Sequence, residues 1–293
     1  MRPRADGVAI VGAGNMGIAL ARGLAAVLPR ARERVVLSGR DASRVRAAAE
    51  KVGVRAARTN AEAVRGASTI VLAVKPQIVP GVLAEIGPEL APGATLLSIS
   101  AGVPTDYLAD RVPAGVGVVR AMPNVAAAVR ASATAFCAAK TARAVDRRRA
   151  REVLEAIGLV VEVDESLMDA VTGLSGTGPL YLFLILESLS DAGVKVGLSR
   201  EVATRLAIQT LVGAAQLVRT TGEHPAKLRD LVTSPGGTAI TALHSLERSG
   251  LKAMLMDAVE AATRRSAELG RARRDAEPVP SPSVAATRGR PPA

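Results

Sequence analysis

Aromatic residues are nearly absent from this chain. Its 293 residues include no Trp, two Tyr and two Phe, so that aromatic side chains make up 1% of the sequence. Proteins that bind single-stranded nucleic acid stack the bases on such side chains, and their scarcity argues against that function. Hydrophobic residues nevertheless amount to 48%, which is typical of a globular chain. The core must therefore be built from Ala, Val, Leu and Ile.

Cysteine and histidine are equally scarce. The single cysteine, Cys137, cannot form a disulfide within the chain, which fits a reducing compartment. It lies in an apolar run and is expected to be a small buried hydrophobe. The two histidines, His224 and His244, have no Cys, His or acidic partners at the spacing of a metal site. We therefore expect no bound metal and ordinary packing or surface roles for both histidines.

Long hydrophobic runs are missing as well. No uninterrupted apolar stretch reaches the ~18 residues that a membrane span requires. The first residues do not form an apolar run before a small-residue cleavage site, as a secretory signal would. These absences predict a cytoplasmic protein without a membrane partner.

Acidic residues are outnumbered by basic ones, and the net charge is +11. Such an excess can indicate a nucleic-acid-binding protein. Part of it lies in residues 271–293, whose Pro, Ser, Ala and Arg content predicts a disordered basic tail. The dense run Arg147–Arg151 is expected to be the solvated face of a helix. We therefore expect no nucleic-acid partner; DNA binding that persists without the tail would contradict this expectation.

Short apolar runs alternate with helical patterns through the first half of the chain. The runs are rich in β-branched residues and nearly continuous, as in parallel strands buried on both faces. This alternation predicts a doubly wound α/β sheet over residues 1–164. The expected strands are Val8–Val11, Val35–Leu37, Thr69–Val74, Thr95–Ser98, Val116–Arg120, Thr134–Ala138 and Leu159–Val163.

The second half, residues 165–270, is expected to be entirely helical. Gly178-Pro179 suits the first turn of one helix, and Ser199 is a plausible N-cap for the next, over Arg200–Thr220. Both helices carry apolar residues on more than one face, so something else must cover them. We expect a second subunit to do so, in a homodimer or larger assembly. The alternative is a compact monomeric bundle.

The first strand runs directly into Gly12-Ala13-Gly14-Asn15-Met16-Gly17 and then a helix. This is G-x-G-x-x-G in the context of a dinucleotide-binding site. Gly12 would permit the tight turn, Gly14 the close approach of a pyrophosphate, and Gly17 the packing of helix on strand. The helix N-terminus would face the phosphates. The expected fold is thus an α/β chain: an N-terminal Rossmann-type doubly wound sheet followed by an all-helical dimerisation domain.

The end of the second strand indicates which coenzyme is bound. NAD-binding domains usually place an acid there for the ribose 2′-hydroxyl, whereas this chain has Ser38 and Arg40. Both can hydrogen-bond a 2′-phosphate, and Arg40 can neutralise it. Asp41 is expected to cap the following helix instead. We predict NADPH as the cofactor, with NADH possible but weaker. No nucleophile elbow or Walker loop appears, so the cofactor should carry the chemistry.

Two segments of the second half are distinctive: Leu228–Glu247, which contains Ser234-Pro235-Gly236-Gly237, and Leu174–Tyr181. Together with the glycine-rich loop they resemble the pyrroline-5-carboxylate reductases, which make proline from its cyclic imine precursor. Further matching segments are Ala73–Gln77, Ser98–Gly102 and Arg120–Asn124, in the family's order, so that the resemblance covers roughly residues 6–270.

The resemblance implies roles for individual positions. The pyrophosphate would lie along Val11, Gly12, Ala13, Gly14, Asn15 and Met16. The 2′-phosphate would meet Ser38 and Arg40, and the adenosine Asn60. The ribose and nicotinamide would lie along Ala73, Val74, Lys75, Pro76 and Ala101. The substrate would be held by Ser234, Gly236, Gly237, Thr238 and Ala239, contributed across a dimer that can assemble into a decamer.

The Ser234–Ala239 loop also suits a bound carboxylate on physical grounds alone. Its two glycines leave the backbone uncovered, and a helix begins near Thr238, so free N–H groups could bind a carboxylate. The family's usual second Thr after Gly-Gly is Ala239 here, and its Gly-Ser-Gly-Pro-Ala-Tyr consensus has Thr177 and Leu180 instead. These changes bear on substrate preference and turnover, while Thr238 stays available as a polar neighbour.

The expected reaction is hydride transfer from NADPH to the C=N carbon of 1-pyrroline-5-carboxylate, giving L-proline in the last step of proline biosynthesis. No strong general acid is visible, so orientation of a protonated imine would supply most of the rate, up to ~7–11 kcal/mol. The alternatives are reduction of a related cyclic imine, a β-hydroxyacid dehydrogenase with Lys195 as proton shuttle, and a non-catalytic NADP sensor.

Overall fold

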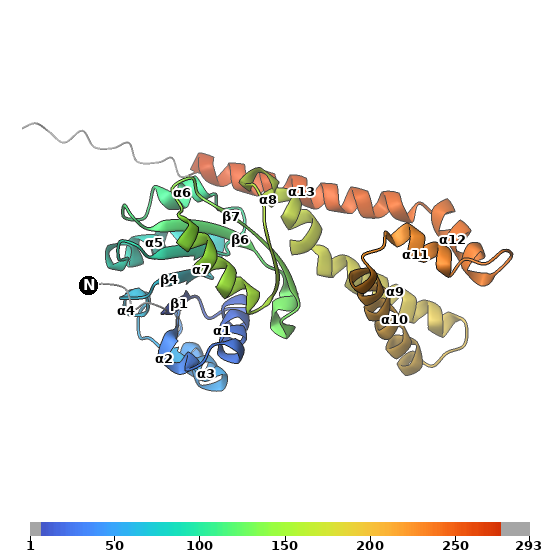
Figure 1. Cartoon of the computed structure of the whole chain (residues 1–293), viewed down its shortest axis with the longest axis horizontal. Helices are drawn as coiled ribbons and strands as arrows, with labels where there is room; N and C mark the ends of the chain where they lie inside the picture. The colour runs from blue at the N-terminus through green and yellow to red at the C-terminus, as the bar shows by residue number, and fades with distance from the viewer. Residues whose placement is uncertain (1–6, 277–293) are drawn as a thin grey trace, which may run out of the picture.

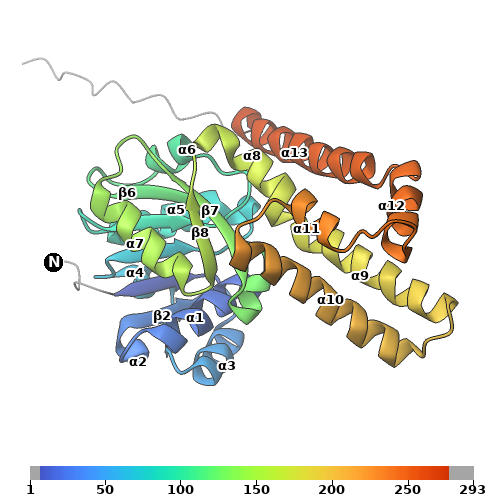
Figure 2. The same cartoon turned by 45° about the vertical axis from the view of Figure 1, so that its right-hand side comes forward.

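The computed structural model describes residues 7–276. It has two parts, a nucleotide-binding sheet flanked by helices and an arm of long helices that extends from one side of it (Figures 1 and 2). Arg2, Arg4 and most of the expected basic tail lie outside the described residues. The last helix, however, continues to Ala276, so residues 271–276, which were expected to belong to the disordered tail, are helical.

One sheet of eight strands forms the first part, in the order β3-β2-β1-β4-β5-β6-β7-β8. Neighbouring strands are parallel except β6 and β7, which are antiparallel. The strands are β1 Val8–Val11, β2 Val35–Ser38, β3 Arg55–Ala56, β4 Thr69–Leu72, β5 Thr95–Ser98, β6 Gly117–Met122, β7 Ser132–Ala138 and β8 Gly158–Glu162. The doubly wound Rossmann-type sheet is thus confirmed.

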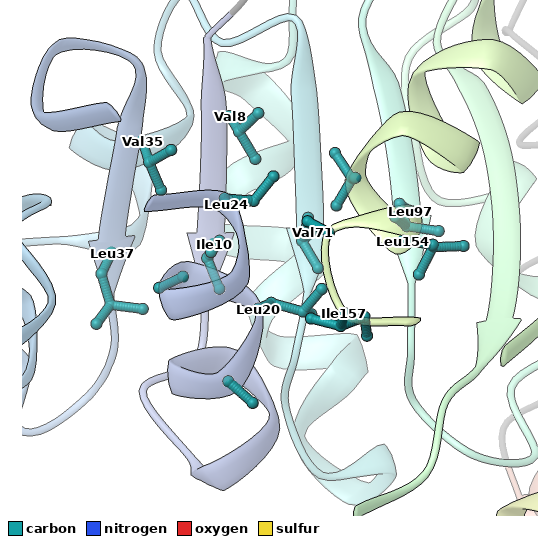
Figure 3. Close-up of a cluster of buried hydrophobic side chains, with 14 of the residues drawn as sticks. Val8, Ile10, Leu20, Leu24, Val35, Leu37, Val71, Leu97, Leu154 and Ile157 are labelled. Carbon is teal, nitrogen blue, oxygen red and sulfur yellow. The ribbon is translucent and has the colours of Figure 1, made fainter. Parts of the chain in front are cut away.

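Helices cover both faces of this sheet, which is why its central strands are apolar on both sides. They are α1 Asn15–Val27, α2 Ala31–Arg34, α3 Ala42–Val52, α4 Asn60–Val64, α5 Val79–Ile86, α6 Thr105–Ala109 and α7 Ala144–Glu155. On one face Leu20 and Leu24 of α1 and Leu154 of α7 pack against Ile10 and Val71 (Figure 3). On the other, a second cluster joins α4, α5 and α6 to the same strands. Short 3-10 turns, η1 Pro76–Ile78, η2 Gly87–Glu89 and η3 Val125–Val129, connect the elements.

The expected strands are all present, with ends displaced by at most two residues. The strand β3 was not predicted, because two exposed residues at a sheet edge show no periodicity. The antiparallel placement of β7 was also unforeseen, since a buried central strand has the same composition in either direction. Cys137 lies in β7 and is buried, as expected.

The arm is entirely helical over its described residues. After η4 Glu165–Leu167 it contains α8 Met168–Val171, the π-helical η5 Thr172–Gly176, α9 Gly178–Lys195, α10 Arg200–Thr221, α11 Pro225–Leu231, α12 Thr238–Arg248 and α13 Leu251–Ala276. Helices α9 and α10 form a hairpin, and Ser199 caps α10 by accepting a hydrogen bond from Val202 N–H at 3.3 Å. Helix α13 runs back along the arm to the Rossmann-type part (Figure 1).

Large apolar side chains stay exposed along the arm. Phe183 and Leu184 on α9 and Leu206 on α10 are 64%, 61% and 55% exposed. The run Glu165–Lys195 is long and apolar enough to span a membrane by length and composition, and only 6% of its most apolar window is buried. The sequence was expected to hold no uninterrupted apolar stretch of that length, and polar residues such as Ser188 do interrupt this one. Exposure on several faces is what an oligomer interface requires.

The junction between the two parts is held by specific hydrogen bonds. The Tyr181 hydroxyl donates to the Gly173 carbonyl at 2.9 Å, within the π-helical turn. Asn124 Nδ2 donates to the Ser175 carbonyl at 3.0 Å and ties that turn to the end of β6. Within the arm, Ser266 Oγ donates to Asp169 Oδ1 at 2.7 Å and joins α13 to α8. The Asn124 bond therefore ties the base of the arm to the sheet, and the other two bonds hold that base together.

Candidate active site

The glycine-rich loop has the geometry that the sequence predicted. Gly12 has φ of 120°, and a Cβ there would overlap the carbonyl of Ala73. A Cβ at Gly17 would overlap the carbonyl of Gly12, so only glycine lets α1 pack this closely on β1. At Gly14, by contrast, a Cβ would meet nothing within 4 Å. The loop is therefore closed toward the protein and open at Gly14, where a pyrophosphate can approach the start of α1.

A pocket lies in front of this loop, at the carboxyl ends of the parallel strands. Of the predicted cofactor residues, it is lined by Gly12, Ala13, Gly14, Arg40, Asn60, Ala73, Val74 and Lys75. Pro76 and Ala101 line a neighbouring pocket. Val11 and Ser38 are fully buried beneath the lining, and Asn15 and Met16 begin α1 without lining either pocket. Ten of the 14 predicted cofactor residues thus line one of the two pockets, but the eight at the first pocket make up fewer than half of the 19 residues that line it.

The end of the pocket that is predicted to hold the adenosine contains a short hydrogen-bond chain. Ser38 Oγ donates to Asn60 Oδ1 at 2.9 Å, and Asn60 Nδ2 donates to Glu85 Oε2 at 2.8 Å. Asp41 caps α3, as predicted, and the hydrogen bond from the Ser43 hydroxyl, aided by that from Arg44 N–H, lowers the pKa of its carboxyl. The carboxylate oxygens of Asp41 therefore bond the start of α3. The residue near the end of β2 that is available to the ribose is Arg40 rather than an acid.

Two arginines of this pocket, Arg44 and Arg58, were not predicted. Arg44 belongs to the helix that follows β2. Arg58 follows the edge strand β3, which the sequence pattern did not disclose. Its position could have been found only by noticing a basic residue directly before Thr59, the N-cap of α4, whose side chain accepts a hydrogen bond from Glu62 N–H at 3.0 Å.

The second pocket lies between the sheet and the base of the arm. Pro76, Gln77, Ala101 and Gly102 line it from the sheet side, and Thr172, Thr177, Ala262, Arg265, Ser266 and Leu269 from the arm. The hydroxyls of Thr172 and Thr177 donate to the backbone carbonyls of Met168 and Thr172, respectively. Because it adjoins Ala73–Pro76, this pocket suits the nicotinamide end of a dinucleotide. The contribution of α13 was not predicted.

The predicted substrate residues lie elsewhere. Ser234, Gly236, Gly237, Thr238 and Ala239 form the turn between α11 and α12, at the part of the arm away from the sheet (Figures 1 and 2). The turn has the expected form: Gly236 has φ of 67°, Gly237 is the N-cap, and α12 begins at Thr238. None of these residues lines either pocket. One chain therefore does not bring its own Ser234–Ala239 loop to its own cofactor pocket.

Other reactive side chains are not in position for chemistry. Burial raises the pKa of the Cys137 thiol to about 12, so it stays protonated at neutral pH. His224 caps α11 by accepting a hydrogen bond from Ala226 N–H at 3.2 Å, and His244 lies on α12. Over residues 7–276 no group of three or more Cys, His, Asp or Glu residues could hold a metal ion.

The fold and the pocket together define a class of protein. A Rossmann-type sheet with a glycine loop open to a pyrophosphate, and with arginine at the end of β2, belongs to an NADP-dependent oxidoreductase. A family model described as "NADP oxidoreductase coenzyme F420-dependent" matches residues 7–102, and one described as "Pyrroline-5-carboxylate reductase dimerisation" matches residues 165–269. The helical arm is therefore a self-association domain.

Curated relatives identify the family. A pyrroline-5-carboxylate reductase of Methanosarcina acetivorans is 41% identical over 264 residues, covering 90% of this chain and 98% of the relative. One of Synechocystis is 42% identical over 265 residues, covering 89% and 97%. A solved structure of such a reductase from Coxiella burnetii superposes with a TM-score of 0.85 at 34% identity, covering 91% and 99%. That from Plasmodium falciparum, with NADP bound, gives 0.79 at 33%, covering 92% and 99%. The chain belongs to the pyrroline-5-carboxylate reductase family.

Proposed function

We propose that this chain reduces 1-pyrroline-5-carboxylate to L-proline with NADPH, in the last step of proline biosynthesis. The bound coenzyme supplies a hydride, which adds to the carbon of the C=N bond, while the imine nitrogen keeps or gains one proton. The observation that carries the proposal is the Ser234–Ala239 loop. It opens α12 with two glycines and no side-chain cap, in a chain whose cofactor pocket suits NADP.

The chemistry of the loop suits a small carboxylate. Helix α12 has 11 residues, and the first intrahelical bond at its start runs from Thr241 N–H to the Gly237 carbonyl. The N–H groups of Thr238 and Ala239 thus have no partner within the helix. With no bulky side chain at Gly236 or Gly237, a carboxylate can reach these donors. The rest of a five-membered ring would then project toward a neighbouring surface.

The neighbouring surface is proposed to be the cofactor pocket of a second chain. The loop does not reach the pockets of its own chain, and the exposed apolar faces of α9 and α10 supply an interface of the kind that dimers bury. Each active site would then combine the Rossmann-type domain, residues 1–164, with the loop of the partner's helical domain, residues 165–270. We further propose a soluble, cytoplasmic enzyme without nucleic-acid or membrane partners, whose dimers can form a decamer.

Thr238 is the proposed polar contact to the imine nitrogen, because the following residue, Ala239, has no hydroxyl. Thr238 is exposed at the first turn of α12, and its side chain makes no hydrogen bond in the described structure. Replacing Thr238 by Ala is expected to lower kcat/KM by about tenfold, the effect of one hydrogen bond to a charged group. Thr241→Ala serves as control, since that hydroxyl bonds the Gly237 carbonyl of its own helix.

The first measurement is NADPH oxidation with purified protein and 1-pyrroline-5-carboxylate, repeated with NADH. Proline formation that favours NADPH supports the proposal. Bound NADPH without turnover of any imine would instead indicate a sensor. Turnover of a different cyclic imine, with none of 1-pyrroline-5-carboxylate, would indicate a reductase of that related imine. A β-hydroxyacid dehydrogenase, with Lys195 as its candidate proton shuttle, is disfavoured because the curated relatives at about 40% identity are pyrroline-5-carboxylate reductases.

A further inference from the structure

We propose that Arg58 is a specificity-determining residue, which binds the 2′-phosphate of NADPH together with Arg40 and Arg44. The three guanidinium groups would form one anion site at the adenosine end of the cofactor pocket. The inference rests on the proposed position of the 2′-phosphate beside Arg40. It adds two residues to that site, one of which follows an edge strand that no sequence pattern indicated.

The topology brings the three arginines to one place. Arg40 follows β2, and Arg58 follows β3, which pairs with β2 in parallel. The pairing continues past the strands, since Ala57 N–H donates to the Leu37 carbonyl at 2.9 Å. Because parallel strands end at the same edge of a sheet, the two arginines leave it side by side. Arg44 projects from the first turn of α3, and all three line the same pocket.

In the described part of the chain, none of these three arginines forms an ion pair with a carboxylate, although the charge of Arg44 helps to lower the pKa of Asp41, which is bonded to the start of α3. Elsewhere in the domain, arginines pair with carboxylates, as in Arg65–Glu89 at 2.8 Å and Arg147–Glu162 at 3.0 Å. Within residues 7–276, the side chains of Arg40, Arg44 and Arg58 make no salt bridge. Unpaired guanidinium groups around one pocket match a phosphate, which they bind through paired, charge-assisted hydrogen bonds.

The neighbouring polar groups are already engaged. Ser38 is fully buried, and its hydroxyl directs its one proton at Asn60. Asn60 in turn donates to Glu85. The chain thus forms a fixed floor for the adenosine, and the strongest donors that face the pocket are the arginines. This modifies the sequence-based expectation, in which Ser38 shared the phosphate with Arg40.

The backbone at Arg58 is fixed in a way that leaves its guanidinium available. Arg58 N–H donates to Glu62 Oε2 at 2.9 Å, and Thr59 Oγ1 accepts from Glu62 N–H at 3.0 Å. This reciprocal cap anchors the start of α4. The Glu62 carboxylate thus accepts from a backbone N–H, and it forms no ion pair with the Arg58 guanidinium.

The test measures coenzyme binding to the full chain by NADPH and NADH fluorescence titration. For Arg58→Gln, the Kd for NADPH is expected to rise about tenfold, equivalent to about 1.4 kcal/mol, while the Kd for NADH changes by less than about twofold. Displacement by 2′,5′-ADP should weaken in parallel, and displacement by 5′-AMP should not. Arg55→Gln is the matched control, since Arg55 lies three residues earlier on β3 and lines only other pockets.

Two results would overturn the proposal. Unchanged NADPH affinity in Arg58→Gln would remove the residue from the site. Equal loss of NADPH and NADH affinity would leave the discrimination between them unchanged and would show that Arg58 contacts the adenine or stabilises the fold. Because these titrations contain no imine, they are independent of whether the chain reduces 1-pyrroline-5-carboxylate. A failure of that activity with preserved NADPH preference would reject the proposed reaction and leave the anion site supported.

Discussion

Asp146 is a buried carboxylate enclosed by the N-terminal ends of β5 and β6. It accepts hydrogen bonds from Thr95 Oγ1 at 2.7 Å, and from the backbone and guanidinium of Arg143 at 2.8 to 2.9 Å. Gly117 packs against it so closely that a Cβ there would overlap the carboxylate. Burial alone would raise the pKa of Asp146, but the hydrogen bonds from Arg143 and Thr95 outweigh it and the pKa lies below its ordinary value.

This lowered pKa predicts how stability depends on pH. The folded state holds the deprotonated form, so the stabilisation is complete above the unfolded-state pKa of about 3.9 and is lost as pH falls through the lower folded-state pKa. Asp146→Ala should reduce the free energy of unfolding at pH 7 by about 2 kcal/mol, less than for a fully buried pair because Arg143 is half exposed.

Chemical denaturation at pH 7 and at pH 3 measures this effect. The difference between wild type and Asp146→Ala should shrink at the lower pH. Glu152→Ala is the control, because Glu152 pairs with Arg148 on the exposed face of α7 and its removal should change little. A constant difference between wild type and Asp146→Ala at both pH values would contradict the linkage.

Individual residues were predictable where the local backbone geometry requires a particular residue type. Gly12 and Gly17 occupy positions where any Cβ would clash, and Asp41 stands where a helix needs a cap. Asp146 and Arg58 were not predictable, because their roles depend on partners distant in sequence: Thr95 for the one and the strand β2 for the other. No local pattern records such contacts.

At the scale of elements, the sequence predicted long buried strands and amphipathic helices, and missed elements that are short or defined by their neighbours. The strand β3 has only two exposed residues, and its existence depends on pairing with β2. The π-helical turn Thr172–Gly176 is another case. Its segment was conspicuous as a motif, but only the structure shows that Tyr181, Asn124 and α13 hold it in this form.

The motif around Gly173 and Gly176 thus has a structural explanation. A Cβ at Gly173 would overlap Thr263 of α13, and one at Gly176 would overlap the end of the Met122 side chain. These glycines allow the base of the arm to lie directly against the sheet and against α13. The turn therefore sets the direction in which the arm leaves the Rossmann-type part, and with it the position of every residue beyond Gly178.

At the scale of the whole molecule, self-association belongs to the helical arm and the predicted coenzyme pocket to the Rossmann-type part. Phe183→Glu, on the exposed apolar face of α9, should yield a species with the mass of one chain in light scattering, because a buried charge at an interface is costly. NADPH binding should persist, since the pocket is lined by one chain, whereas reduction of the imine should be lost. Val27→Glu on α1, also exposed in the single chain, should leave mass and activity unchanged.

The apolar surface of the arm was predicted from sequence, since its helices are hydrophobic on several faces. The location of the Ser234–Ala239 loop was not, because it depends on the path of the chain through α10 and α11. In Figure 2, α10 runs back toward the sheet, and α11 and the turn after it lead away from the sheet again. The sequence could identify both halves of the proposed site, but not that the loop of one chain lies away from its own cofactor pocket.

The distance between the loop and its own cofactor pocket has a genetic consequence. Gly14→Leu would block the pyrophosphate approach, and Gly236→Val would distort a loop that needs positive φ; each homodimer should be inactive. In a hybrid dimer, one site would carry both defects and the other none. Mixed variants, after subunit exchange, should regain about a quarter of wild-type activity, as expected for random pairing in a two-fold dimer. Sites built within one chain would show no such complementation.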